Sequence, residues 1–571
     1  MSTRLIIIGG VAGGATAAAR ARRLDEQAEI IMFERGEYIS FANCGLPYYV
    51  SGVIPKRESL LVTTAQAMRD RYRVDVRPRH EVTAIHRDRK TVEIRDLEKS
   101  QTYEEKYDKI ILSPGAEPVR PPLPGIDLEG IHTIRNLPDI DRVKAVLDTR
   151  KPESAVVIGG GFIGLEMAEN LVHLGIKTTV VEMLDQVMPP LDPEMAAYAQ
   201  AHLKDQGVDM VLGDGVQGFR SESGGLVVTT SSGREIPCGM VILSIGVRPE
   251  NKLAKDAGLA LGERGHIKVD ASLRTSDPDI FAVGDAVEVV DRITGMPTAT
   301  ALAGPANKQA RIAADNALGR RSIFKGTIGT AVVKVFNLTV ATTGASEKTL
   351  KRLGRPYLAC YTHAGSHASY YPGATNTTIK LLFAPHDGKI LGAQIVGREG
   401  ADKRIDVLAT AIHGNMTVFD LEELELAYAP PYGSAKDPIN MIGFVAANIL
   451  KGDMDAITWS EKDQIDPAVT DILDVRTPME LKILGQVPGA RPIPIDNLRK
   501  ELENGGLDPN KEYITYCAVG QRAYLANRIL TQNGYRTRNL SGGYFNFLSQ
   551  DGRLMSDSPQ VKTWLVDDEK S

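Results

Sequence analysis

The sequence predicts a multidomain α/β protein, and three observations lead to this fold class. The chain has 571 residues, too many for one hydrophobic core, so we expect three or four domains. Two segments, starting at Arg4 and at Ser154, share the order of a short apolar run, a glycine turn and a helix-forming run. Near the C-terminus, the apolar run YITY leads into a loop with Cys and Gly and then into a helical pattern. Alternating buried strands and helices are typical of parallel sheets.

The bulk composition argues against several classes of protein. Apolar residues make up 43% of the chain and charged residues 24%, as in ordinary globular proteins. A net charge of −5 gives no support to a nucleic-acid-binding surface. No apolar run approaches the roughly 18 residues of a membrane span, and the N-terminus lacks a signal-peptide hydrophobic region. Four cysteines in so long a chain form no disulfide framework. We therefore expect a reducing cytoplasm, in which an important cysteine is reactive rather than structural.

The first repeated segment, RLIIIGGVAGGATAAARARR, predicts a strand, a tight turn and an Ala-rich helix. A second apolar run, IIMFE, follows and ends in Glu34. This is the order of a βαβ dinucleotide site, where glycines let the backbone approach a pyrophosphate and the acid binds ribose hydroxyls. Gly9 and Gly14 take the first and third positions of the GxGxxG fingerprint, whereas Val11 takes the middle one.

The second repeated segment, SAVVIGGGFIGLEMAENLVHLG, has the complete fingerprint in Gly159, Gly161 and Gly164, and its second strand TTVVE ends in Glu182. A lone glycine fingerprint is often only a tight turn, but two copies, each with an acid about twenty residues on, argue against that interpretation. Two apolar residues follow Glu182, with no Arg or Lys to hold a 2′-phosphate. This favours NADH over NADPH.

Three further strand–turn segments separate the roles of the two sites: ILSPGAEP (111–118), LSIGVRPE (243–250) and TSDPDIFAVGDAVE (275–288). With them, residues 1–450 resemble the two-dinucleotide-domain flavoprotein disulfide reductases. The resemblance implies that the first βαβ unit binds FAD and the inserted one binds NADH. NADH then reduces the flavin, and the reduced flavin passes two electrons to a sulfur. The FAD-binding residues that it implies are Gly9, Gly14, Glu34, Ser113, Gly115, Gly284 and Asp285. Those for NADH are Gly159, Gly161, Gly164, Glu182 and Gly246.

A single cysteine, Cys44, lies in the loop SFANCGLPYY with no second cysteine nearby. Such a cysteine is oxidised only by pairing with an external sulfur or by becoming a sulfenic acid. We expect Cys238 and Cys360, in contrast, to be small core residues. The SFxxCG motif is shared by NADH oxidases and peroxidases, which use a sulfenate, and by coenzyme A disulfide reductases, which form a Cys–S–S–CoA mixed disulfide.

Three features favour the coenzyme A branch. Arg20 and Arg23 follow Thr16 at i+4 and i+7, so the three side chains share one helix face. Such a face could bind the phosphates of coenzyme A, although a solvated basic face would show the same pattern. The segments HASYYPGA (367–374) and AYAPPYGSAKDPINMIG (427–443) resemble that branch's C-terminal signatures, and Ser40 and Asn43 match substrate-contacting positions. The resemblance implies these coenzyme A-binding residues: Thr16, Arg20, Arg23, Ser40, Asn43 and Lys436.

The same resemblance implies a homodimer in which tyrosines of the partner subunit reach over the reacting sulfurs. Tyr370 and Tyr428 are then catalytic together with Cys44. Tyr371 is an alternative to Tyr370, and plain interface packing is an alternative role for these aromatic residues. A tyrosine hydroxyl at a sulfur site could instead protonate or stabilise a leaving thiolate.

A further unit follows the polar stretch KDQIDPA, with ILDVRTPMEL (472–481) and then the loop CAVGQR after YITY. Gly520 and the helix start direct backbone N–H groups at the loop centre, a cradle for a thiolate or an anion. The segment resembles a rhodanese domain, with Asp474, Arg476 and Glu480 in its DVRxxxE signature. By this resemblance Cys517 carries sulfur as a persulfide within a loop that includes Gly520 and Arg522. A dual-specificity phosphatase, the alternative, has a loop one residue longer.

The sequence thus predicts two Rossmann-like dinucleotide-binding domains, an α+β dimerisation domain and a C-terminal α/β rhodanese domain. The limits are 1–120 and 250–325 for the FAD domain, 121–249 for the NAD domain, 326–452 for the dimerisation domain and 461–571 for the rhodanese domain. We expect an NADH-dependent reductase of persulfides or polysulfides with FAD and coenzyme A, and no metal. The alternatives are a coenzyme A-disulfide reductase, an NADH peroxidase or oxidase, and a noncatalytic sulfane-sulfur sensor or relay.

Overall fold

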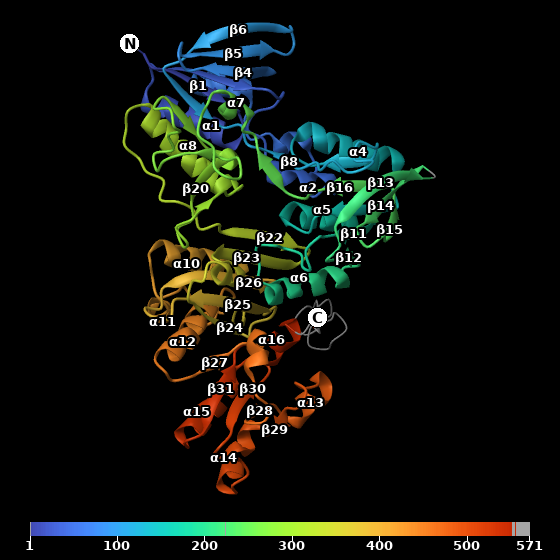
Figure 1. Cartoon of the computed structure of the whole chain (residues 1–571), viewed down its shortest axis with the longest axis vertical. Helices are drawn as coiled ribbons and strands as arrows, with labels where there is room; N and C mark the ends of the chain where they lie inside the picture. Colours follow the sequence, from blue (N-terminus) through green and yellow to red (C-terminus); the bar gives the residue numbers. More distant parts are fainter. Residues whose placement is uncertain (1, 223, 551–553, 555–571) are drawn as a thin grey trace. The chain divides into compact units, whose positions relative to one another are not determined.

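The computed structural model describes residues 2–222, 224–550 and 554, so most of the stretch 551–571 of the predicted rhodanese domain lies outside the described residues. The chain divides into two compact units (Figure 1). Unit 1 contains the residues up to Met183 together with Asp214–Thr327, and unit 2 contains Leu184–Gly213 and the residues from Ile328 onward. No helix in the described part of the chain is long and apolar enough to cross a membrane.

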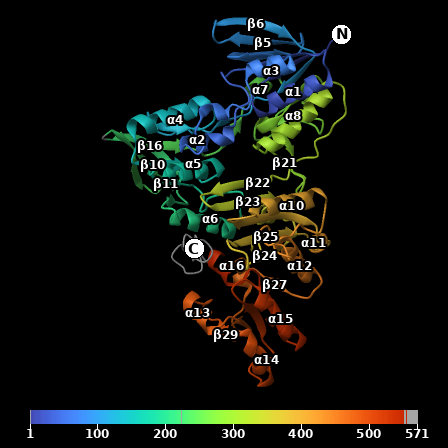
Figure 2. The ribbon, with the colours of Figure 1, turned by 180° about the vertical axis from the view of Figure 1, so that it is seen from behind.

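The first sheet of unit 1 is parallel and has the order β19-β7-β1-β2-β3. Its strands are β1 (Arg4–Ile8), β2 (Glu29–Glu34), β3 (Asp75–Pro78), β7 (Lys109–Leu112) and β19 (Ile280–Ala282). Helices α1 (Ala12–Leu24) and α8 (Ala303–Ala317) lie side by side (Figures 1 and 2). Alanines of both helices are buried in one core cluster with this sheet, and their small side chains let the two helices approach closely.

The second parallel sheet of unit 1 has neighbouring strands in the order β11-β10-β16-β9. They are β9 (Ile131–Thr133), β10 (Ser154–Ile158), β11 (Lys177–Val181) and β16 (Met240–Leu243), with helices α4 (Leu137–Arg150) and α5 (Phe162–His173). Strand β10 is almost wholly buried, as expected of a parallel strand covered on both faces. Each repeated sequence segment therefore forms the βαβ unit that its glycine pattern predicts.

The main sheet of unit 2 is antiparallel and has the order β22-β23-β26-β25-β24. Its strands are β22 (Ala331–Val335), β23 (Leu338–Gly344), β24 (Leu358–Gly365), β25 (Asn376–Phe383) and β26 (Ile390–Gly397). The helices that contact it include α6 (Pro193–Asp205), α10 (Ala401–His413) and α12 (Pro438–Leu450). Strands β25 and β26 are buried nearly throughout, so both of their faces are covered.

The C-terminal part of unit 2 holds a parallel sheet of order β27-β31-β30-β28-β29. Its strands are β27 (Ala456–Ile457), β28 (Thr470–Asp474), β29 (Arg491–Pro492), β30 (Glu512–Tyr516) and β31 (Arg536–Leu540). Its helices are α13 (Pro478–Leu484), α14 (Ile495–Glu503), α15 (Gln521–Gln532) and α16 (Gly543–Gln550). The mixed α/β fold class is confirmed, whereas the four domain limits stay a prediction.

Candidate functional site

The first glycine turn joins β1 to α1 and leaves no room for side chains. Gly9 has a φ of +96°, and a Cβ there would lie 2.1 Å from the carbonyl oxygen of Ser113. A Cβ at Gly14 would lie 1.8 Å from the carbonyl oxygen of Gly9. At the end of β2, the carboxylate of Glu34 accepts a hydrogen bond of 2.8 Å from the backbone N–H of Gly10. The packing of strand, turn and helix thus requires both glycines and fixes the acid beside the turn.

A cavity of about 900 Å³ opens beside this turn. Seven of the residues predicted from the sequence line it: Gly9, Glu34, Asn43, Ser113, Gly115, Gly284 and Asp285. Gly14 is not among its lining residues because it packs against Gly9. A cavity of this size, with a helix N-terminus and an acid at its wall, fits a dinucleotide such as FAD.

Several charged residues that could not be singled out from the sequence also line this cavity, among them Arg135 and Glu250. The side chains of these two residues form an ion pair of 2.8 Å. Burial raises the pKa of Asp285, and the charge of Arg135 acts against that rise. The sequence does contain a local signal near Arg135: the next residue, Asn136, is the N-cap of α4 and forms a capping box.

The second glycine turn, between β10 and α5, repeats the geometry of the first. Glu182 accepts a hydrogen bond of 2.7 Å from the backbone N–H of Gly160, and a Cβ at Gly164 would lie 1.9 Å from the carbonyl oxygen of Gly159. A Cβ at Gly161 or Gly246, in contrast, would meet no protein atom within 4 Å. The glycine at position 161 is therefore not required by packing, and it fits the close approach of a pyrophosphate.

Replacing Gly161 with alanine is expected to raise the KM for NADH about tenfold or more, the effect of one misplaced methyl group in a binding site. Folding should not change, because the new Cβ meets no neighbour. Steady-state kinetics at varied NADH and a thermal melt check both statements. An unchanged KM would contradict the assignment of this turn to NADH.

Cys44 lies in a 3₁₀ turn, Asn43–Gly45, at the start of α2 (Leu46–Val50), and it is exposed. Ser40 holds the loop in place with a left-handed φ of +46°, and its N–H donates to the carbonyl oxygen of Gly10 at 2.9 Å. The loop of the single cysteine is thereby tied to the first glycine turn. Partial burial raises the pKa of the Cys44 thiol, and the carboxylates of Glu166 and Asp285 raise it further.

Helix α5 brings a second acid near Cys44, which the sequence analysis did not single out. The Tyr48 hydroxyl donates a hydrogen bond of 3.2 Å to Glu166, and burial raises the pKa of Glu166 to about 7. Glu166 acts on the pKa of both Cys44 and Tyr48. It lies two residues after the last glycine of the second fingerprint, so the sequence marks its position but not its proximity to Cys44.

The predicted coenzyme A face of α1 has partners on helix α8. The hydroxyl of Thr16 donates to Asn307 at 2.5 Å, and Arg20 forms a hydrogen-bonded ion pair of 2.7 Å with Asp315. Arg23 is exposed. A phosphate at this face would therefore compete with Asp315 for Arg20, and the role of these residues stays a prediction.

In unit 2, the two predicted catalytic tyrosines lie together. The hydroxyl groups of Tyr370 and Tyr428 are 2.7 Å apart, both side chains are exposed, and this hydrogen bond raises the pKa of Tyr428. Lys436 is also exposed.

The segments that carry these tyrosines are fixed by a buried residue that the sequence analysis missed, Arg404 on α10. Its guanidinium pairs with Asp437 at 2.9 Å and donates to the carbonyl oxygen of Ser366 at 2.7 Å. Nothing in the local sequence marks Arg404 for this role, because its partners come from distant segments.

The loop after β30 has the geometry predicted for an anion cradle. The backbone N–H of Gly520 donates to the Sγ of Cys517 at 3.1 Å, and the φ of Gly520 is +102°. Arg522, at the start of α15, makes two hydrogen bonds of 2.8 and 2.5 Å to Glu480. Hydrogen bonds from Arg522 and Thr477 lower the pKa of Glu480 to about 2, whereas burial acts to raise it. Cys517 itself is fully buried.

The other two signature residues, Asp474 and Arg476, form a fully buried ion pair of 2.6 Å. The Arg476 guanidinium also lies 4.1 Å from the ring centroid of Tyr544. Arg476 has no exposed surface, so it supports the sheet rather than facing a substrate.

Comparison with known proteins agrees with this geometry. Residues 3–308 match the model of the family described as pyridine nucleotide-disulphide oxidoreductase. The chain belongs to this family. Residues 330–437 match its dimerisation domain, and residues 457–550 match a rhodanese-like domain. The protein is therefore an FAD-dependent pyridine nucleotide-disulphide oxidoreductase that carries a rhodanese domain, as the sequence predicted.

Individual relatives cover most of the chain. A coenzyme A disulfide reductase of Staphylococcus epidermidis is 37% identical over 444 residues, which is 78% of this chain and 99% of the relative. The crystal structure of reduced Bacillus anthracis CoADR-RHD is 52% identical, with a TM-score of 0.94, and the match covers 96% of this chain and 98% of that one. An NAD-dependent persulfide reductase from A. fulgidus is 37% identical, with a TM-score of 0.88, over 95% of this chain and 100% of that one.

The two remaining cysteines of this oxidoreductase are core residues, as expected. Cys238 on β15 (Glu235–Cys238) and Cys360 on β24 are buried, and burial raises the pKa of both thiols. The reactive candidates are therefore Cys44, which is exposed, and Cys517, which lies in a loop built to stabilise negative charge.

Proposed function

We propose that this oxidoreductase is an NADH-dependent reductase of persulfides and polysulfides that acts on coenzyme A persulfide and releases hydrosulfide. The observation that carries the proposal is the presence of two different cysteine sites in one chain. Cys44 lies in the loop tied to the flavin-type cavity, and Cys517 lies in an anion-binding loop. Two solved structures extend over nearly the whole chain, the A. fulgidus persulfide reductase with 95% coverage and B. anthracis CoADR-RHD with 96%, whereas the S. epidermidis coenzyme A disulfide reductase matches 78% of it.

In the proposed reaction, the Cys44 thiolate attacks the sulfur of CoA–S–SH that is bonded to coenzyme A. This forms Cys44–S–S–CoA and releases HS⁻. Bound FAD would transfer two electrons from NADH to this disulfide. In sum, one hydride from NADH converts the persulfide to coenzyme A and hydrosulfide.

The chain's own residues have two tasks in this reaction. Arg23 and Lys436 are exposed cations available to coenzyme A phosphates. In a homodimer, the partner subunit's Tyr370 and Tyr428 would protonate the departing thiolate. Their mutual hydrogen bond raises the pKa of Tyr428.

Anaerobic NADH oxidation and sulfide release, measured side by side with four acceptors, test the proposal. We expect fast turnover with stoichiometric sulfide from coenzyme A persulfide or polysulfide. A preference for coenzyme A disulfide without sulfide would make the protein a coenzyme A-disulfide reductase. Preference for H₂O₂, with a Cys44 sulfenate, would make it a peroxidase, and slow turnover with every acceptor would favour a sensor.

The role of Cys517 as a sulfur carrier gives a separate prediction. In a Cys517→Ser variant, sulfide release from polysulfide should fall about 100-fold or more, because the sulfur-accepting nucleophile is gone. Turnover of coenzyme A persulfide should stay unchanged, since Cys44 receives that substrate directly. Cys360→Ala serves as the control for loss of a buried thiol. Equal turnover of both substrates by Cys517→Ser would remove Cys517 from the cycle.

A further inference from the structure

One face of strands β24 and β25 is polar, yet it is covered. Tyr361 and His363 are two residues apart on β24 and therefore point to the same face. Their register partners on β25 are Lys380 and Thr378. Tyr361, Thr378 and Lys380 are at most 3% exposed. A polar sheet face is normally solvated, so another segment of the chain must cover this one.

The cover comes from residues 541–545, which follow the last strand of the C-terminal sheet. The backbone N–H of Tyr361 donates to the hydroxyl of Ser541 at 3.1 Å, as an amide on the outer side of an edge strand can. Nε2 of His363 lies 3.0 Å from the carbonyl oxygen of Gly542, and its Nδ1 lies 3.0 Å from the hydroxyl of Thr378. A carbonyl only accepts, so Nε2 carries the proton. Burial lowers the pKa of His363 to about 4, which keeps the ring neutral.

The same segment is the wall of the Cys517 loop. The backbone N–H of Tyr544 donates to the carbonyl oxygen of Cys517 at 2.8 Å, and that of Phe545 donates to Ala518 at 3.2 Å. A Cβ at Gly543 would lie 2.4 Å from the carbonyl oxygen of Cys517. A shift of this segment would therefore move the backbone that holds Cys517.

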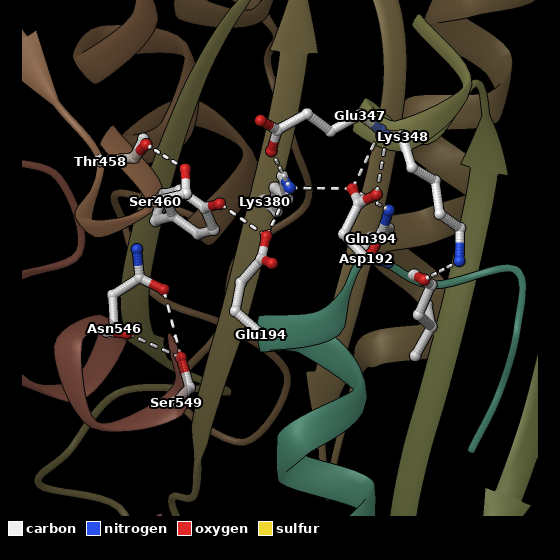
Figure 3. Close-up of polar contacts among 12 residues, drawn as sticks. Asp192, Glu194, Glu347, Lys348, Lys380, Gln394, Thr458, Ser460, Asn546 and Ser549 are labelled. Carbon is white, nitrogen blue, oxygen red and sulfur yellow. Dashed lines mark hydrogen bonds and ion pairs between the residues drawn. The ribbon is translucent and has the colours of Figure 1, made fainter. Parts of the chain in front are cut away.

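The strand on the other side of this contact is rigidly held. The Tyr361 hydroxyl donates to Glu194 at 2.7 Å, and Glu194 in turn pairs with the ammonium group of Lys380 (Figure 3). A Cβ at Gly542 would lie 3.0 Å from the Cβ of Tyr361, so the two segments are in close contact. Strand β24 thus offers a fixed surface to the wall of the loop.

We infer that the dimerisation domain is part of the sulfur-transfer site, with His363 as the positioning residue that holds Gly542 and thereby the backbone around Cys517. The functional meaning of this inference rests on the proposed role of Cys517 as a sulfur carrier. His363 acts through the segment 541–545 and touches no reacting atom.

The test compares His363→Ala, His363→Gln and, as a control, His386→Ala, an exposed histidine of the same domain. Thiosulfate and cyanide serve as sulfur donor and acceptor, and sulfite and thiocyanate are the products. We expect His363→Ala to lower kcat about tenfold with an unchanged KM for thiosulfate. The carbonyl oxygen of Gly542 loses its hydrogen-bond donor, and the Cys517 loop therefore loses its fixed position. His363→Gln should recover most of the rate because its amide can donate to Gly542. NADH-dependent reduction of coenzyme A disulfide should be the same in all variants.

Hydrogen exchange on the full-length protein gives a readout that does not depend on sulfur transfer. The amides of Gly520 and Tyr544 should exchange faster in His363→Ala than in His363→Gln or His386→Ala. If the wild type transfers no sulfur, the proposed role of Cys517 fails, and exchange alone decides whether His363 positions the loop. Exchange and kcat equal to wild type in His363→Ala would overturn the inference.

Discussion

A Cys44→Ser variant is expected to lose NADH-dependent reduction of persulfides and disulfides by a factor of about 1,000 or more, the scale seen when a catalytic nucleophile is removed. No other cysteine can take its place: Cys238 and Cys360 are buried core residues, and Cys517 lies in the loop after β30, not in the loop tied to the flavin-type cavity. Serine cannot form a mixed disulfide with coenzyme A. The measurement is the steady-state rate of anaerobic NADH oxidation with each sulfur acceptor.

Two controls separate loss of chemistry from loss of the site. The variant should keep its flavin and reduce it once with NADH, because Cys44 is not a lining residue of the cavity beside the first glycine turn. Cys238→Ala, which removes a buried thiol from β15, should retain the wild-type rate within a few-fold. Residual activity of Cys44→Ser above about a tenth of wild type would rule out Cys44 as the obligatory nucleophile.

The parts of this molecule that could be predicted from the sequence are those with local signals. Both βαβ units follow from runs such as RLIII and SAVVI next to glycine turns, and the hydrogen bonds from Gly10 to Glu34 and from Gly160 to Glu182 show the same geometry in both. The Cys517 loop was predictable for the same reason, since a strand, a glycine and a helix start lie within one short stretch. The full burial of the Cys517 side chain was not, because the covering segment lies beyond α15 and β31.

Long-range side-chain pairs could not be predicted. Asp192 and Lys380 are separated by 188 positions and Arg404 and Asp437 by 33, and neither pair leaves a periodic mark in the sequence. The same limit affects α1, whose basic face was interpreted as a phosphate site. Its Arg20 is paired with Asp315, on a helix 295 positions away. Charges near one another in the sequence predict a surface, but their partners depend on the fold.

The buried ammonium group of Lys380 has three carboxylate partners, Asp192, Glu194 and Glu347 (Figure 3). These are also the only group of acids in the described residues with spacing suited to a metal ion. Burial alone would lower the pKa of Lys380, but Tyr361 and the carboxylates raise it well above its ordinary value. The lysine is therefore charged, and it is the buried counter-charge of three carboxylates that are themselves largely buried.

Replacing Lys380 with methionine is accordingly expected to destabilise unit 2 by about 3–5 kcal/mol, because it leaves buried carboxylates without a counter-charge. The matched control is Lys351→Met, which removes an exposed ammonium group from the same Glu347 and should cost less than about 1 kcal/mol. Denaturant unfolding of the full-length protein, followed by tryptophan fluorescence, compares the two variants. Equal small losses of unfolding free energy in both variants would show that the three buried carboxylates do not need the ammonium group of Lys380.

The pH dependence of this loss identifies its cause. Burial acts to raise the pKa of Glu347, but Lys380, Lys351 and Tyr357 together lower it from 4.5 to about 2. A carboxylate with a lowered folded-state pKa contributes stability above its unfolded pKa, and this contribution disappears as the pH falls toward the folded value. The difference in stability between wild type and Lys380→Met should therefore be largest above pH 4.5 and shrink as the pH approaches 2. A difference that stays constant over this range would mean that lost packing of the lysine stem, rather than lost charge, destabilises the variant.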